Sequence, residues 1–115
     1  MMKKAIALLV LSACALFAEG SVIHVVTIKW KPGTSQQQIQ AALDGVKTVQ
    51  KEYKGIKHVW TRSIKVQGDG YTHAVAMEFE SEQSLKDYTG SPAQLKWYKV
   101  YMAIREESTT HDITN

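Results

Sequence analysis

The chain has 115 residues, and its 14 Lys and Arg against 11 Asp and Glu give a formal net charge of +3 at pH 7. Charges of both signs are interspersed along the whole chain, so the composition does not indicate a nucleic-acid-binding protein. A single cysteine excludes a disulfide framework.

Residues 1–20 predict a secretory signal peptide. Lys3 and Lys4 form a basic start, and the apolar run over 5–18 is shorter than the roughly 20 residues that a membrane-spanning helix needs. The small residues at its end allow cleavage after Ala18 or after Gly20. We therefore expect a secreted or periplasmic protein with one domain over residues 21–115, which keeps 12 basic and 10 acidic residues.

The segment Leu11–Cys14 (LSAC) leaves an alternative open, because it resembles a bacterial lipobox. Lipidation of Cys14 would anchor the protein to a membrane, and we expect no other membrane attachment. Cleavage downstream of Cys14 would instead leave a mature protein without cysteine. Thiol nucleophiles and cysteine-based zinc sites are then excluded.

Residues 22–31 (VIHVVTIKWK) predict a strand that is apolar on both faces. Val26 and Ile28 share one face with His24, and Ile23 and Val25 lie on the other. A strand of this kind needs a cover on each side. This requirement decides the expected assembly.

Helical spacing of apolar residues predicts one amphipathic helix over 36–54. Ser35 and Gln38 can form a capping box at its start, and Gly55 is expected to end it. The rest of the chain predicts, in order, strands over 56–66 and 72–79 with a turn at 67–70, helices over 81–88 and 92–104, and a polar strand over 105–113.

This β-α-β-β-α-β order predicts an α+β fold with a ferredoxin-like sheet and helices on one face. The chain has no further element with which to cover the second face. A second copy of the chain is therefore expected there, as a homodimer.

Three segments together resemble the stress-responsive dimeric α/β-barrel (Dabb) domain family. They are, in chain order, 24–33 (HVVTIKWKPG), 70–74 (GYTHA) and 88–92 (YTGSP). The resemblance covers nearly all of the chain after residue 21. It implies a homodimer in which two sheets meet back to back as a dimeric α/β barrel.

The family includes plant polyketide cyclases of the olivetolic acid cyclase type, which work without a cofactor. The resemblance implies an acid-base pair of Tyr and His within the motif Tyr-x-x-His-Pro-x-His. The corresponding stretch over 88–94 is YTGSPAQ, so Tyr88 is kept, while Ser91 and Gln94 replace the two histidines. Because an amide has no titratable proton, Gln94 favours a binding protein over an enzyme.

We therefore predict a protein that binds a small, partly apolar molecule without a cofactor and without catalysis. The alternative is a cofactor-free cyclase, lyase or monooxygenase, with Tyr88 and His24 as acid and base. A third interpretation is a structural dimer with a filled core and no ligand. These three interpretations differ in what lies between the sheet and the helices.

The predicted ligand pocket lies under the helices. His24 and His73 match histidines of the cyclases, and adjacent strands can bring both rings into one pocket. Alternatively, each is a buried histidine with a structural hydrogen bond. The residues expected to line the pocket are His24, Val26, Ile28, His73, Val75, Met77, Tyr88, Gln94, Trp97 and Asp112.

No metal site is predicted. The four histidines and the nearby acidic residues lack the i,i+4 or short-loop spacing of zinc ligands. The segment 68–70 (GDG) lies between two strands, where it indicates a turn and not a phosphate-binding loop.

Overall fold

Residues 20–115 are described by the structure, which is a computed structural model. The predicted signal peptide up to residue 19, with Cys14, lies outside the described residues. The elements are β1 (Val22–Trp30), α2 (Gln36–Glu52), β2 (Ile56–Trp60), β3 (His73–Phe79), α3 (Glu82–Tyr88), α4 (Pro92–Ile104) and β4 (Arg105–Thr114). No helix between residues 20 and 115 is both long and apolar enough to cross a bilayer.

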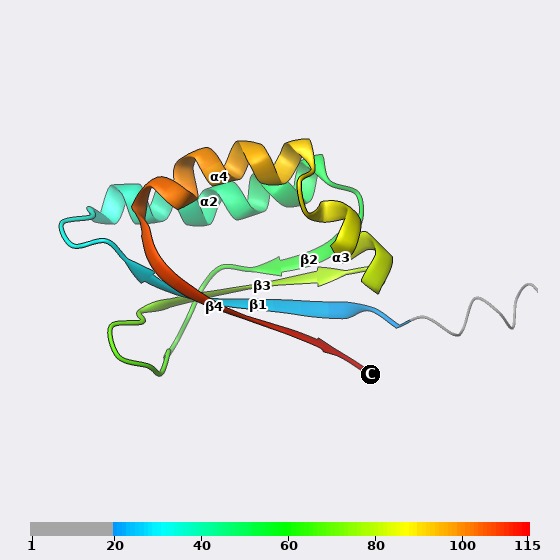
Figure 1. The fold of residues 1–115 in the computed structure, drawn as a ribbon, viewed down its shortest axis with the longest axis horizontal. Coiled ribbons are helices and arrows are strands. Elements are labelled where there is room, and N and C mark those ends of the chain that lie inside the picture. Colours follow the sequence, from blue (N-terminus) through cyan, green and yellow to red (C-terminus); the bar gives the residue numbers. More distant parts are fainter. Residues whose placement is uncertain (1–19) are drawn as a thin grey trace, which may run out of the picture.

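The four strands form one antiparallel sheet in the order β2-β3-β1-β4, and the helices lie over one of its faces (Figure 1). This arrangement confirms the predicted α+β, ferredoxin-like fold. The chain passes from α4 directly into β4, which curves down beside β1 and pairs with it along its whole length. The two central strands of the sheet are β3 and β1.

The core lies between the inner face of the sheet and the helices, with α2 and α4 contributing most of the helical side. On β1, Val26 and Ile28 are buried, and Val26 pairs with Val75 of β3. On α2, the buried positions follow the predicted helical spacing: Ile39, Ala42, Leu43, Val46 and Val49. Full burial of one such aliphatic side chain contributes about 1.5–3 kcal/mol, so this face holds the sheet and the helices together.

The predicted capping box at the start of α2 is confirmed, because Gln38 N donates to Ser35 Oγ and Ser35 N donates to Gln38 Oε1. The expectation that Gly55 ends the helix is wrong. The helix ends at Glu52, and Tyr53 caps it in an extended conformation. Gly55 is required for close packing, since a Cβ there would lie 2.6 Å from the Tyr53 ring.

The second strand is shorter than predicted, because β2 ends at Trp60 and not at residue 66. The following segment leaves the sheet, and its Ile64 is almost fully exposed. Ser63 Oγ accepts the Ala74 N–H and donates to the Ala74 carbonyl. A side chain thus takes the backbone hydrogen bonds of β3 that a longer partner strand would have made.

The outer face of the sheet is open in the part of the chain that the structure describes. Ile23 and Val25 are half-buried there, and Val25 pairs with Ala76 of β3 and His111 of β4. Trp60 is 50% exposed on this side, at the end of β2. Within residues 20–115, no helix covers this face (Figure 1).

Candidate functional site

A cavity of about 200 Å³ lies between the inner face of the sheet and helices α3 and α4. Six of the predicted residues line it, namely His24, Val26, Met77, Tyr88, Gln94 and Trp97. The sequence did not predict the other lining residues, which are Leu85, Thr89, Tyr98, Tyr101, Arg105, Ser108 and Thr110.

The remaining predicted residues lie elsewhere. Ile28 and Val75 are buried in the core and do not reach the cavity. Asp112 forms a hydrogen bond with His24 and lines a neighbouring hollow on the surface, not this cavity. His73 lies at the start of β3, whereas His24 pairs with Met77 near the end of that strand. His24 and His73 therefore do not share a pocket.

His24 and Asp112 form a hydrogen-bonded pair across β1 and β4. They are direct partners in the strand register, and 2.5 Å separates His24 Nδ1 from Asp112 Oδ1. An ionised carboxylate only accepts hydrogen bonds, so Nδ1 carries a proton and a neutral His24 keeps a lone pair on Nε2. Within residues 20–115, no three His, Cys, Asp or Glu side chains gather closely enough to hold a metal ion.

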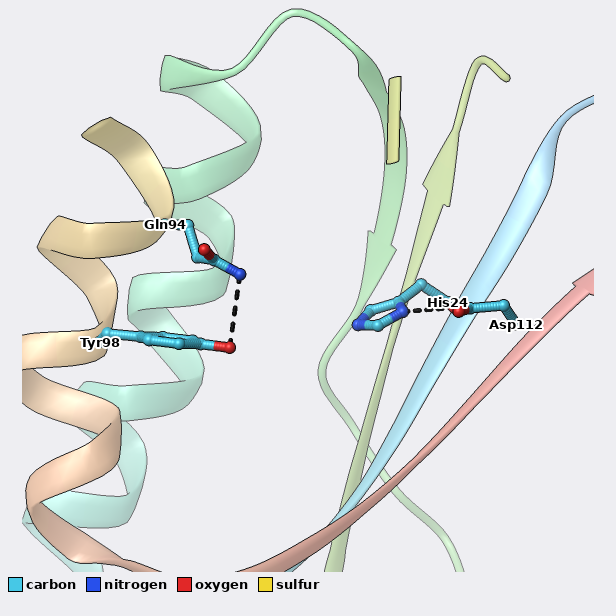
Figure 2. A network of polar contacts seen from close by, with 4 residues as sticks. All are labelled: His24, Gln94, Tyr98 and Asp112. Carbon is cyan, nitrogen blue, oxygen red and sulfur yellow. Dashed lines mark hydrogen bonds and ion pairs between the residues drawn. The ribbon is translucent and has the colours of Figure 1, made fainter. Parts of the chain in front are cut away.

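Gln94 and Tyr98 face this pair from α4. The Gln94 Oε1 atom accepts the Gly90 N–H at 2.6 Å, and its Nε2 donates to Tyr98 Oη at 3.3 Å. In Figure 2 the Tyr98 hydroxyl and the His24 ring point toward one another from α4 and β1. Since Tyr98 Oη accepts from Gln94, its own proton is available to a group between the helix and the sheet.

Two tyrosine hydroxyls at the cavity have no hydrogen-bond partner. Tyr88 and Tyr101 are 2% and 3% exposed, and neither Oη finds a partner among the described residues. Burial raises the pKa of Tyr88 far above its ordinary value, and it also raises the pKa of Tyr101. Both side chains are therefore neutral hydrogen-bond donors at pH 7.

The polar side of β4 forms the floor of the cavity. Ser108 and Thr110, which pair with Ile28 and Val26 of β1, both line the cavity, and of the two β1 residues Val26 lines it as well. A final strand rich in polar residues was visible in the sequence, and this position explains its composition. Tyr98 and Tyr101 follow Gln94 at four and seven residues, a helical spacing that would also have identified them.

His73 has a different environment. Its Nδ1 accepts a hydrogen bond from Trp30 Nε1 at 2.9 Å and lies 2.8 Å from Thr72 Oγ1. Since the indole N–H can only donate, a neutral His73 carries its proton on Nε2. Burial lowers the pKa of His73, which favours this neutral form.

A second hollow of about 400 Å³ opens beside the cavity, between α3 and the ends of β1 and β4. His24, Leu85 and Thr89 line both spaces. We call this second space the outer hollow. Because the two spaces share these residues, His24 lies between the cavity and the outer hollow.

Comparison with known sequences finds one matching family model, the Stress responsive A/B Barrel Domain (Dabb), over residues 22–115. A stress-response A/B barrel domain-containing protein, HS1 of Arabidopsis thaliana, is 25% identical over 88 residues, which cover 74% of this chain and 81% of that protein. Olivetolic acid cyclase of Cannabis sativa is 27% identical over 97 residues, 82% of this chain and 96% of the cyclase.

Solved structures show the same fold. The hydroxynitrile lyase of Passiflora edulis superimposes with a TM-score of 0.75 at 22% identity, covering 84% of this chain and 94% of the lyase. A dimeric ferredoxin-like protein of Thermobifida fusca gives a TM-score of 0.72 at 10% identity, covering 85% of this chain and 93% of that protein. At these identities the structural likeness establishes the fold, and the chemistry has to be argued from this chain's own residues.

Proposed function

The chain belongs to the stress responsive A/B barrel domain (Dabb) family, and from this premise we propose that it is a homodimer whose cavity binds a small, partly apolar molecule. The observation that carries this proposal is the pair of unpartnered hydroxyls of Tyr88 and Tyr101 at the cavity. A buried polar group without a partner costs about 1–3 kcal/mol. A bound molecule with an oxygen acceptor would offset part of this cost, while Val26 and Met77 contact its apolar part.

We propose binding without catalysis because of what Gln94 does. Its amide is held by Gly90 on one side and by Tyr98 on the other, and it has no proton to exchange. Gln94 therefore orients the Tyr98 hydroxyl. A bound molecule would meet donors and apolar surface from α4, but no titratable group at this position.

Ligand-observed NMR with a set of small phenols, aryl ketones and aryl carboxylates tests the binding proposal. Thr110→Phe places a ring in the cavity and should abolish binding, because Thr110 lines it. Val100→Phe is the control, since Val100 is 47% exposed on α4 and lies away from the cavity. If the wild type binds none of these compounds, or if Thr110→Phe binds as well as the wild type, the proposal is wrong.

The proposed partner for the outer face of the sheet is a second copy of the chain. This face carries half-buried Ile23 and Val25, and the Thermobifida fusca neighbour is described as dimeric. Light scattering at micromolar concentration should give a dimer for the wild type and a monomer for Val25→Asp, because an unpaired charge is costly in an interface. Lys47→Asp, on the exposed side of α2, should remain dimeric. A wild-type monomer would contradict the proposal.

A second candidate function is cofactor-free proton transfer, and the His24–Asp112 pair is the observation that favours it. The free lone pair on His24 Nε2 can accept a proton from a carbon next to a carbonyl group, while Tyr98 donates a hydrogen bond to the developing enolate oxygen (Figure 2). In this arrangement Tyr98, and not Tyr88, is the acid that faces the base. The named activities of the cyclase and lyase relatives are compatible with this chemistry.

The same set of compounds separates the two candidates when product formation is followed. Measurable turnover by the wild type, reduced about 10²- to 10⁴-fold in His24→Gln, would establish the enzyme and reject binding alone. Turnover that His24→Gln leaves unchanged would reject His24 as the base. Binding with no turnover supports the first proposal.

Export remains part of the proposal, on the basis of Lys3, Lys4 and the apolar run over 5–18. N-terminal sequencing of the protein from its natural source should begin at Glu19 or Ser21. A lipid-modified Cys14 at the N-terminus would establish the anchored alternative. An intact Met1 would contradict both.

A further inference from the structure

We propose that the ligand of the cavity is a small carboxylate whose acid group is bound by Arg105. This inference rests on the proposed binding function. Of the thirteen residues that line the cavity, Arg105 is the only one with a permanent charge, and none is acidic. The charge of the lining therefore selects for an anion.

The hydrogen bonds of Arg105 leave part of its guanidinium unused. Nη1 donates to Ser108 Oγ at 3.0 Å, whereas Nε is buried and has no partner among the described residues. Arg105 also forms no ion pair within residues 20–115. A half-buried cation without an anion is unfavourable, so a carboxylate at this position gains a charge-assisted hydrogen bond.

The acidic residues nearest in sequence are engaged elsewhere. Glu106 pairs with Lys29 at 3.5 Å, and Glu107 accepts a hydrogen bond from the Tyr71 hydroxyl at 3.0 Å. Neither one lines the cavity. The charge of Arg105 is therefore not neutralised from within its own strand.

The surroundings of Arg105 favour a carboxylate over a phosphate. A planar guanidinium matches the two oxygens of a carboxylate, and one cation balances one negative charge. The second charge of a phosphate dianion would have no partner in this lining. The Tyr101 hydroxyl supplies an additional donor, since it makes no hydrogen bond of good geometry within residues 20–115 and lies beside the Arg105 and Ser108 side chains.

The strand register gives the ligand a direction. Arg105 pairs with Trp30, whereas Thr110, the last residue of β4 that lines the cavity, pairs with Val26, so the two ends of the cavity floor lie four residues apart on β1, about 13 Å along the strand. The outer hollow beside α3 opens next to His24. The carboxylate would therefore bind at the far end, and the rest of an elongated molecule would extend toward His24 and the surface.

A matched pair of probes tests this assignment. The affinities of 4-phenylbutanoate and its neutral amide are measured by calorimetry at neutral pH, with phenyl phosphate as a third probe. The wild type should bind the carboxylate about 10- to 100-fold more tightly than the amide, the range expected for hydrogen bonds to a charged group. Arg105→Gln should remove this preference by weakening the carboxylate alone. Lys99→Gln, which removes an exposed cation from α4, should change neither affinity.

The outcomes separate this inference from the binding function. Equal affinities for the acid and the amide in the wild type, or a preference that persists in Arg105→Gln, would overturn the role of Arg105 and leave ligand binding intact. Tighter binding of phenyl phosphate would overturn the carboxylate class. No binding of any probe, together with a negative result for the phenols and ketones, would overturn both proposals. Arg105→Lys keeps the charge and should retain part of the preference, which tests the proposal even if Arg105→Gln does not fold.

Discussion

His24 and His73 lie on the same face of the sheet and use Nδ1 in opposite ways. His24 Nδ1 donates to Asp112, whereas His73 Nδ1 accepts from Trp30. The first arrangement leaves a lone pair on Nε2 beside a cavity. The arrangement at His73 puts an N–H on Nε2. For Nδ1 to accept a proton, His73 would have to lose its hydrogen bond from Trp30.

The difference comes from the neighbouring side chain at each end of β1. Near the start of β1, the register places a carboxylate of β4 directly opposite His24. Near its end, the register shifts between Lys29 and Trp30, and the Trp30 indole packs on His73 at 5.6 Å between ring centroids. Thus the carboxylate opposite His24 leaves the Nε2 lone pair of that ring available to a ligand, whereas the indole beside His73 makes that ring part of a structural contact.

The largest expected effect on stability is at the contact between Trp30 and His73. Trp30→Ala removes a ring that packs against the core and also removes the indole N–H that donates to His73, so it should lower the free energy of unfolding by about 3 kcal/mol. Trp30→Phe keeps a ring and should cost about 1 kcal/mol, which isolates the hydrogen bond. Urea denaturation followed by circular dichroism measures both. Equal losses in the two variants would show that the hydrogen bond, not the packing, dominates.

At the cavity, removal of a polar group should stabilise the protein. Tyr88→Phe deletes a buried hydroxyl without a partner and should raise the free energy of unfolding by about 1 kcal/mol while weakening ligand binding. Tyr53 is the matched control, because its ring lies 5.5 Å from that of Tyr88 and its hydroxyl donates to the Ser84 carbonyl at 2.7 Å. Tyr53→Phe should lower stability by about 1 kcal/mol. If both variants changed the free energy of unfolding in the same direction, the proposed difference between the Tyr88 and Tyr53 hydroxyls would be wrong.

Loss of Asp112 should have a smaller effect on stability. Its side chain is 47% exposed, and exposed pairs of this kind contribute about 0–1 kcal/mol. Asp112→Ala should therefore unfold at nearly the wild-type urea concentration. It should also free His24 Nδ1 and allow the proton to move to Nε2. A loss of several kcal/mol would mean that the pair is structural, like Trp30 and His73.

The smallest expected effect is a pH dependence at His73. Its pKa is lower in the folded protein than in the unfolded chain, so the unfolded state binds the extra proton first. Stability should therefore fall as the pH decreases from the unfolded value near 6.5 toward the folded pKa. His73→Gln should flatten this part of the stability profile, measured by denaturation at several pH values. An unchanged slope would show that other groups cause it.

Residue patterns predicted the fold well because they report burial. The alternation along β1 placed His24 with Val26 and Ile28, and in the structure Val26 and Ile28 are buried on that face while His24 is half-buried. The end of β2 was missed, since Ser63 replaces a strand by side-chain hydrogen bonds that no periodicity reveals.

The site was predicted only in part, because it depends on register and on where α4 separates from the sheet. The sequence analysis placed Asp112 in one pocket with His24, but it did not predict that the two residues pair directly, or that Trp30 reaches His73. Arg105 lies where α4 passes into β4, and neither a helical nor a strand pattern marks it as a cavity residue. By contrast, Tyr98 lies one helical turn after Gln94, so the helical spacing would have indicated it, although we did not predict it.

The central claim is that His24 is the chemically available histidine and that His73 is structural. Two-bond proton–nitrogen correlation NMR of the imidazoles at neutral pH reads the protonated nitrogen of each ring directly. A neutral His24 should carry its proton on Nδ1, and His73 should carry it on Nε2. The same tautomer at both positions, or a proton on Nε2 of His24, would contradict the account.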